Sequence, residues 1–186
     1  MKNFKKIIIL SFIVSFLVSC NKDKEALPSA FSIVGKWTFT AIGIKTDINT
    51  TEATVAEIKK LNNGSAVSIG ESTLEFKADG TFVSTEEGVS ETGKYVYDAS
   101  KKSITVTNAQ NEVETNEVIS LSNSEMLLSI AKSSKKNADG DFVFANEAED
   151  FAAYFYALII YSVKSLDVDA ELGKTKTMQL TLKLKK

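Results

Sequence analysis

Alternating apolar and polar side chains mark the first regular element of the chain, at residues 33–40. Trp37 and Phe39 lie two positions apart, and lysine and threonine occupy the positions between and around them. Successive side chains of a β-strand project to opposite faces, so this pattern places both large rings on one buried face. We therefore expect a first strand at about residues 35–45.

A hairpin signal follows at residues 73–85, where two alternating runs flank a turn that contains Gly80. A two-residue turn would pair Lys77 with Phe82 and would mix charged and apolar side chains on one face. A three-residue loop with Gly80 in the left-handed conformation would instead pair Phe76 with Phe82. We predict the second register because it gives the hairpin one continuous apolar face.

Five further segments have the same period-two pattern, at residues 93–97, 103–107, 113–121, 126–131 and 177–184. Eight strands joined mostly by hairpins can close into a barrel whose interior is filled or holds one small ligand. Closure also removes the exposed edges of the sheet. The pattern predicts an all-β fold with accessory helices, built as an eight-stranded up-and-down barrel, with a β-sandwich as the alternative.

Two segments have features of helices. Apolar residues recur at helical spacing in residues 50–61, which predicts a short amphipathic helix over one end of the barrel. Residues 151–161 form an apolar run that is too short to span a membrane. Acidic residues precede this run and suit a helix start, although its aromatics leave a strand as the alternative. We predict a helix there, within a helical insertion at about residues 145–166.

The start of the chain has the order of a secretion signal. Residues 1–19 begin with lysines and continue in a nearly unbroken apolar run. They lead to Cys20, which is the only cysteine, so no intramolecular disulfide can form. The Leu-Val-Ser-Cys sequence that ends there resembles a bacterial lipobox. The resemblance implies cleavage before Cys20, diacylglycerol on its thiol, and an acyl chain such as palmitate on its new amino terminus.

An acylated Cys20 implies that the protein is anchored in the bacterial cell envelope. Several acyl chains give stable anchoring, because each buried methylene contributes about 0.8 kcal/mol. We expect the outer membrane as the location, with the periplasmic or surface face left open. Residues 20–32 would be the lipidated, polar tether, and residues 33–186 would be the folded domain with its helical insertion.

The composition excludes several kinds of chemistry. The chain has no histidine and no arginine, which excludes Ser-His-Asp triads and histidine-bound zinc. It also removes the commonest base contact of sequence-specific nucleic-acid recognition. Without residues 1–19 the chain has 19 lysines against 24 acidic residues, a net charge of −5, which disfavours nucleic-acid binding. We therefore expect no enzyme activity, no metal site, no cofactor and no nucleic-acid partner.

Three short motifs, taken in chain order, resemble those of the bacterial lipocalin-like lipoproteins. Gly35-Lys36-Trp37 resembles the lipocalin GxW motif, and residues 76–82 and then Gly93-Lys94-Tyr95 follow it. The similarity covers about residues 33–107 by motif, and the remainder by strand count. It implies an up-and-down calycin barrel with one open end.

The chain departs from the lipocalin pattern in two ways. It has no arginine late in the sequence to stack on Trp37, so only Lys183 or Lys185 could take that role. The long insertion at residues 133–172 is also atypical, and it could fill or cap the open end of the barrel.

The resulting hypothesis is a membrane-anchored lipocalin-like lipoprotein that binds a small apolar ligand in its barrel. Large inward side chains would line the cavity, and tyrosine hydroxyls would orient the ligand. The candidate ligand-binding residues are Trp37, Phe39, Phe76, Phe82, Tyr95, Tyr97, Phe151, Phe155 and Leu158. The alternative is a structural or protein-interaction lipoprotein of the cell envelope with a filled barrel. In both cases we expect a monomer held to a membrane through Cys20.

Overall fold

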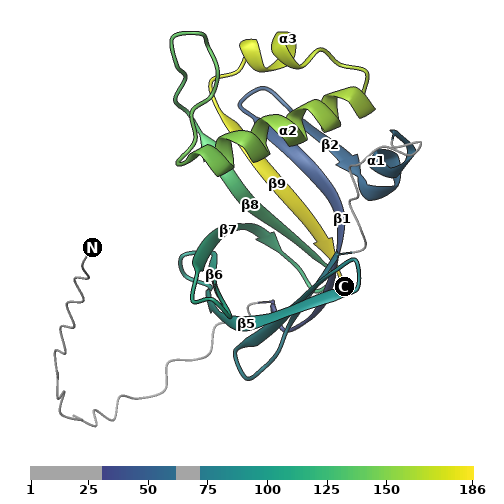
Figure 1. Cartoon of the computed structure of the whole chain (residues 1–186), viewed down its shortest axis with the longest axis vertical. Coiled ribbons are helices and arrows are strands. Elements are labelled where there is room, and N and C mark those ends of the chain that lie inside the picture. Colours follow the sequence, from purple (N-terminus) through teal and green to yellow (C-terminus); the bar gives the residue numbers. More distant parts are fainter. Residues whose placement is uncertain (1–30, 62–71) are drawn as a thin grey trace, which may run out of the picture.

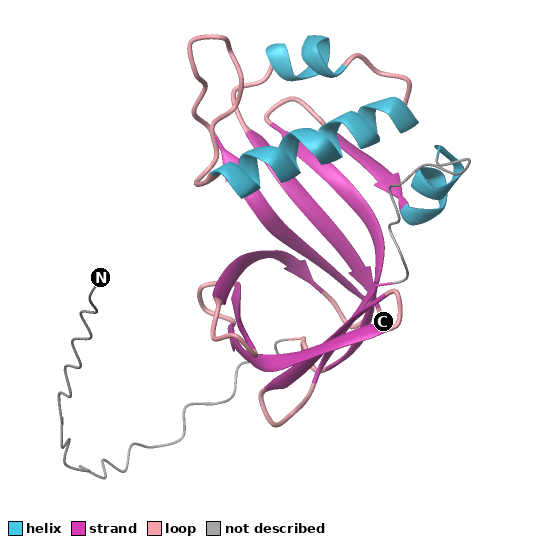
Figure 2. Ribbon diagram, in the orientation of Figure 1, coloured by secondary structure: helices cyan, strands magenta, loops and turns pink. Residues whose placement is uncertain are grey.

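The computed structural model describes residues 31–61 and 72–186, which form strands and three helices (Figures 1 and 2). The strands are β1 (Gly35–Thr46), β2 (Thr50–Thr54), β3 (Ser72–Phe76), β4 (Thr81–Glu86), β5 (Val89–Asp98), β6 (Ser103–Asn108), β7 (Val113–Leu121), β8 (Glu125–Ser133) and β9 (Met178–Lys185). The helices are α1 (Val55–Leu61), α2 (Glu147–Val163) and α3 (Val168–Gly173). The predicted signal segment and most of the predicted tether, including Cys20, lie outside the described residues.

The nine strands of the described residues form one antiparallel sheet that closes in a ring. Their order is β2-β1-β3-β4-β5-β6-β7-β8-β9, and an additional pairing of β1 with β9 closes the ring. β1 is long enough to pair with β3 along its first residues and with β2 along its last. The predicted all-β class is confirmed. The β-sandwich alternative is wrong, because a single sheet replaces the two stacked sheets that it requires.

The predicted register of the hairpin between β3 and β4 is confirmed. Phe76 lies opposite Phe82, and Gly80 has a φ of +83°, in the left-handed region. The side chain of Asp79 accepts hydrogen bonds from the hydroxyl and the N–H of Thr81, at 2.6 and 2.9 Å. These bonds close the turn and hold the pKa of Asp79 below its ordinary value.

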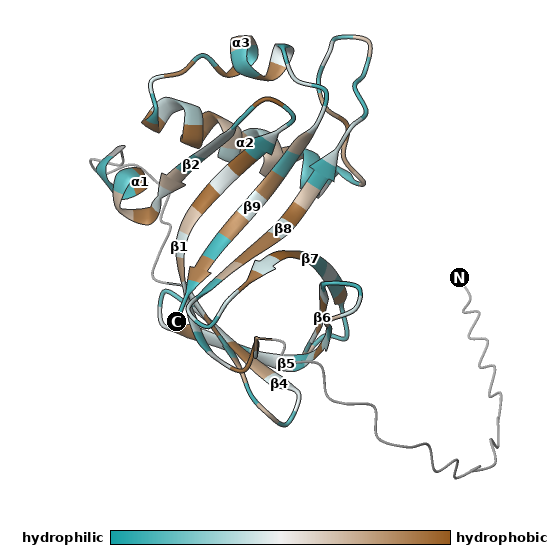
Figure 3. Cartoon of the chain, turned by 180° about the vertical axis from the view of Figure 1, so that it is seen from behind, coloured by the Kyte–Doolittle hydropathy of each residue, from teal (hydrophilic) through white to brown (hydrophobic). Residues whose placement is uncertain are grey.

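The apolar side chains form two clusters along shared strands. The ring cluster lies inside the ring and consists of Ile33, Trp37, Phe76, Phe82, Ile104, Val118, Met126, Leu128 and Leu184. The helix cluster lies between α2 and the projecting ends of β1, β2, β8 and β9, and its fully buried members include Ile42, Ile44, Ile160, Tyr161, Met178 and Leu180. Figure 3 shows apolar residues along these strands beneath α2. The same strands therefore serve two cores, one at each end.

A bulge lets β1 contribute to both clusters. Its pairing with β9 shifts register between Phe39 and Ala41. A strict alternation from Trp37 would place Ile42 and Ile44 on the opposite face of the strand. The extra residue turns them toward α2 instead, since a bulge re-aims the side chains that follow it. β8 has a similar register shift against β9, just before it reaches the helix cluster.

The predicted helix at residues 50–61 is wrong in its first part, which is strand β2. Thr50–Thr54 pairs with residues 41–45 of β1, and the helix α1 begins only at Val55. Thr54 and Glu57 form a capping box that fixes this start: the Thr54 hydroxyl accepts from Glu57 N–H, and the Glu57 carboxylate accepts from Thr54 N–H. The eight strands predicted from the sequence do not include β2, which is the additional strand of the sheet.

The predicted helix over residues 151–161 is confirmed as part of α2. Asn146 caps its start by accepting a hydrogen bond from Glu149 N–H at 3.0 Å, and acidic residues occupy its first turn. Ala153 and Ala157 are fully buried, and these small side chains let the helix lie close to the sheet. The short helix α3, which follows it, was not expected from the sequence.

Candidate functional site

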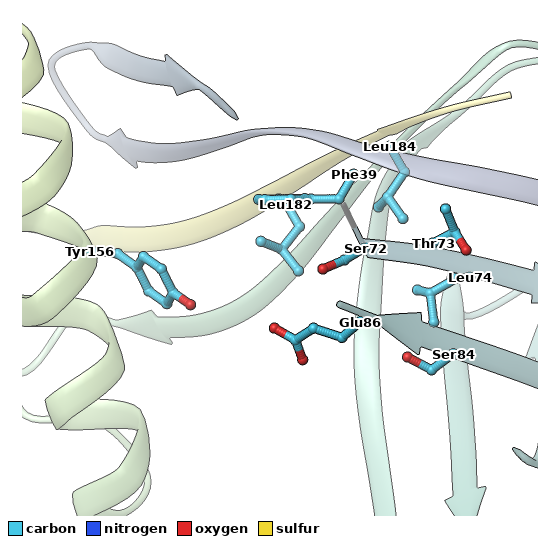
Figure 4. Close-up of a pocket in the computed structure, with 9 residues that line it drawn as sticks. All are labelled: Phe39, Ser72, Thr73, Leu74, Ser84, Glu86, Tyr156, Leu182 and Leu184. Atoms are coloured by element: carbon cyan, nitrogen blue, oxygen red, sulfur yellow. The ribbon is translucent and has the colours of Figure 1, made fainter. Parts of the chain in front are cut away.

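A pocket of about 240 Å³ lies where α2 faces the open end of the ring (Figure 4). We call it the mouth pocket. Its lining consists of Phe39, Ser72, Thr73, Leu74, Ser84, Glu86, Tyr156, Leu182 and Leu184. The pocket lies between the two cores, because Leu184 belongs to the ring cluster and Phe39 packs against the helix cluster. The bulge in β1 and the position of α2 together leave this space unfilled.

The mouth pocket has an apolar wall and a polar rim. Leucines from β3 and β9, together with Phe39 of β1, supply the apolar wall. Hydroxyls of Ser72, Thr73 and Ser84 lie on β3 and β4, and the hydroxyl of Tyr156 enters from α2 (Figure 4). Ligand pockets typically combine a mainly apolar lining with a few polar groups that fix orientation, and this lining has that composition.

One charged side chain faces Tyr156 across the mouth pocket. The Glu86 carboxylate, at the end of β4, and the Tyr156 hydroxyl point toward one another (Figure 4). Burial raises the pKa of the Tyr156 hydroxyl, and the negative charge of Glu86 raises it further. Tyr156 therefore stays protonated at neutral pH and can both donate and accept a hydrogen bond.

The structure places the predicted ligand-binding residues in three different environments. Trp37, Phe76 and Phe82 are buried in the ring cluster, where they fill the interior of the ring. Tyr95 and Tyr97 are half-buried against the same cluster, and Tyr95 packs edge-on against Phe76 at 4.8 Å between ring centroids. Of the nine predicted residues, Phe39 alone lines the mouth pocket.

The three candidates on α2 lie on its outer face. Phe151 is 72% exposed and Leu158 is 53% exposed, and Phe155 stacks on Phe151 at 5.7 Å. The face that packs on the sheet carries Ala153 and Ala157 instead.

Sequence reasoning therefore missed Tyr156 and Glu86 as pocket residues. For Tyr156 a signal was present, because two alanines four positions apart mark the closely packed face of a helix. Tyr156 lies at the edge of that face, one turn before Ile160. For Glu86 the sequence carries no comparable signal, since its position depends on how β4 meets α2.

Trp37 closes the opposite end of the ring. Its Nε1 donates a hydrogen bond to the Ile33 carbonyl at 2.6 Å, and the Lys186 Nζ lies 4.6 Å from the ring centroid. The expectation that Lys183 or Lys185 would cover this ring is wrong. Both project from the other face of β9 and pair with acidic residues, whereas Lys186 follows the strand and can turn back.

Comparisons with family models, with curated proteins and with solved structures find no match to this chain. Across residues 31–61 and 72–186, no three or more histidine, cysteine or acidic side chains gather in a way that could hold a metal ion. None of the helices in the described part of the chain combines the length and the apolar character needed to cross a bilayer.

Proposed function

We propose that this chain is a lipid-anchored, lipocalin-like binding protein that takes a small, mainly apolar ligand in the mouth pocket. The eight strands of the ring, from β1 through β3–β9, would correspond to the up-and-down barrel of that class, and β2 is an addition. The observation that carries the proposal is an apolar-walled pocket with a few polar groups at the open end of a ring whose other end is filled.

The size of the pocket limits the ligand. Its volume of about 240 Å³ is below the ~300–1,000 Å³ of typical small-molecule sites. At about 30 Å³ for each water molecule, it equals roughly eight waters. The aromatic residues of the ring cluster are packed and do not extend this space, so the ligand would be a short-chain molecule rather than a large cofactor.

The test of binding uses the chain from residue 21 onward, which keeps every strand of the ring and every described helix. We expect octanol to bind saturably, as measured by native mass spectrometry and by displacement of a hydrophobic fluorophore. Ser84→Phe places a ring in the mouth pocket and should weaken binding at least about tenfold, the loss expected when apolar contacts of about 1.4 kcal/mol are blocked. Ser90→Phe, on the exposed surface of β5, is the matched control and should leave binding unchanged.

If octanol does not bind, or if Ser84→Phe and Ser90→Phe bind it alike, the mouth pocket is not a ligand site.

The proposed anchor has a separate test. Cys20→Ala removes the only thiol of the chain. We expect the unchanged protein, expressed in a bacterium with lipoprotein-processing enzymes, to incorporate labelled palmitate and to fractionate with membranes. The Cys20→Ala variant should lose the label. Equal labelling of both proteins, or none in the unchanged one, would argue against the anchor.

A second function, as an interaction lipoprotein, is supported by the outer face of α2. Phe151 and Leu158 are exposed there, and exposed apolar side chains on one face are typical of contact surfaces. A photo-crosslinking amino acid at position 158 should then capture one defined protein in cells. The same group at Lys132, exposed on β8, is the control. Identical patterns from both positions would oppose this function.

A further inference from the structure

We infer that the mouth pocket selects amphiphiles with a cationic head group, such as a primary amine, over amphiphiles with a carboxylate. This inference rests on the proposed function, because it concerns the chemical class of the ligand of the same pocket. It follows from the charge of Glu86 in the described lining, the acceptors around that charge and the depth at which the apolar wall begins.

The charge at the mouth pocket is negative. Among the described residues that line it, Glu86 is the one charged side chain, and none of them is a lysine. A neighbouring surface hollow at the turn between β4 and β5 shares Ser84 and Glu86 and adds Glu87 and Glu91. Lys183, between the lining residues Leu182 and Leu184, projects from the other face of β9 and pairs with Glu52 on β2. An approaching head group therefore meets a negative field.

The acceptors suit an ammonium group. An ammonium carries three donors and no acceptor, so it needs oxygen atoms around it. The Glu86 carboxylate, the Tyr156 hydroxyl and the Ser84 hydroxyl all line the mouth pocket and can accept (Figure 4). A ligand carboxylate placed there would lie beside the Glu86 carboxylate, and like charges at this range disfavour binding.

The apolar wall sets the orientation of the ligand. Leu184 is buried in the ring cluster and Leu74 packs against it, so these side chains mark the inner end of the pocket. Glu86 is exposed at the last position of β4, which marks the outer end. An alkyl chain would therefore enter toward the leucines, and its head group would remain at the rim beside Glu86.

Three ligands of equal chain length test this selectivity: octylamine, octanol and octanoate, at pH 7 and low salt, on the chain from residue 21. An exposed ion pair contributes up to about 1 kcal/mol, or about fivefold. We expect octylamine to bind about fivefold more tightly than octanol, and octanoate to bind more weakly than octanol. The preference should shrink in 1 M salt, where charges are screened over about 3 Å.

Two variants assign the preference to one carboxylate. Glu86→Gln should bring the three affinities within about twofold of one another. Glu75→Gln removes the same charge from the outward face of β3, outside the pocket lining, and should leave the preference intact.

The outcomes separate the inference from the proposed function. Octanoate binding as tightly as octylamine, or a preference that survives in Glu86→Gln, would overturn the inference while octanol binding still supports the pocket. Failure of all three ligands to bind would overturn the proposed function and the inference with it.

Discussion

Trp37 is the side chain on which the filled end of the ring depends. It is fully buried, its indole N–H is satisfied by the Ile33 carbonyl, and Lys186 covers its face. We predict that Trp37→Ala lowers the free energy of unfolding by about 3–5 kcal/mol, through lost burial and an unfilled cavity. Urea titration followed by circular dichroism measures this loss. Circular dichroism is used because the variant lacks the only tryptophan and therefore has no tryptophan fluorescence to follow.

The control for Trp37→Ala is a variant of Lys186, the cation that covers the Trp37 ring. Lys186→Met keeps an alkyl chain over the ring and removes the charge, so it should cost about 0.5–1 kcal/mol. If Trp37→Ala lowered stability by no more than Lys186→Met does, Trp37 would not be the centre of the ring cluster.

Glu57 connects α1 to α2 through a charge that depends on pH. Its carboxylate accepts a hydrogen bond from Lys164 Nζ at 2.7 Å. That bond, with further bonds from the N–H and hydroxyl of Thr54, lowers the pKa of Glu57 to about 2. A carboxyl with a lowered folded pKa stabilises the fold above its unfolded value, here 4.5. This contribution is lost as the pH falls from about 4.5 through about 2.

The prediction is that Glu57→Gln reduces the stability of the fold at neutral pH and makes stability less dependent on pH between about 4.5 and 2. Urea unfolding at a series of pH values, for this variant and the unchanged chain, measures the difference. Glu75→Gln, which removes an exposed carboxylate from β3, is the matched control. Profiles that coincide for the Glu57 variant and the unchanged chain would show that the α1–α2 ion pair does not form.

At the scale of elements, α2 depends on small side chains for its close approach to the sheet. Ala157 is fully buried in the helix cluster, whereas its neighbour Leu158 is exposed. We predict that Ala157→Leu overpacks this contact and costs about 1–3 kcal/mol of stability. Leu158→Ala changes side-chain size in the opposite sense on the outer face and should stay within about 0.5 kcal/mol. Chemical denaturation compares them, and an equal effect would mean that α2 does not pack by this face.

The strands with local patterns could be predicted from the sequence. The hairpin register followed from residues that lie close together in the chain, Phe76, Gly80 and Phe82, and the structure has that register. β2 could not be predicted in the same way, because its threonines become a strand by pairing with β1, and the next residues already have helical spacing. The bulge in β1 is likewise set by its partner β9, which is far away in sequence.

The buried face of α2 is only weakly marked in the sequence. The helix is apolar on nearly every side, so aromatics such as Phe151 compete with the alanine pair at positions 153 and 157 as the face that meets the sheet. The tertiary packing decides it: Ala153, Ala157 and Tyr161 lie buried in the helix cluster, whereas Phe151 is exposed. The candidate ligand residues on the outer face of α2 follow from this ambiguity.

At the scale of the whole molecule, the sheet joins a filled end to an end covered by a helix. The ring cluster occupies one end, the helix cluster the other, and the mouth pocket lies between them. Its lining comes from five elements, β1, β3, β4, α2 and β9, which are distant along the chain. The sequence could indicate apolar inward positions, but it could not indicate which of them pack against each other and which remain beside empty space.

The most direct test of this account is a titration of octanol into protein labelled at the leucine methyl groups, followed by NMR. Saturable shifts are expected at Leu74, Leu182 and Leu184, which line the mouth pocket, and Leu158 on the outer face of α2 should not shift. Shifts confined to Leu158, or no saturable shift at the three pocket leucines, would contradict a ligand site between α2 and the ring.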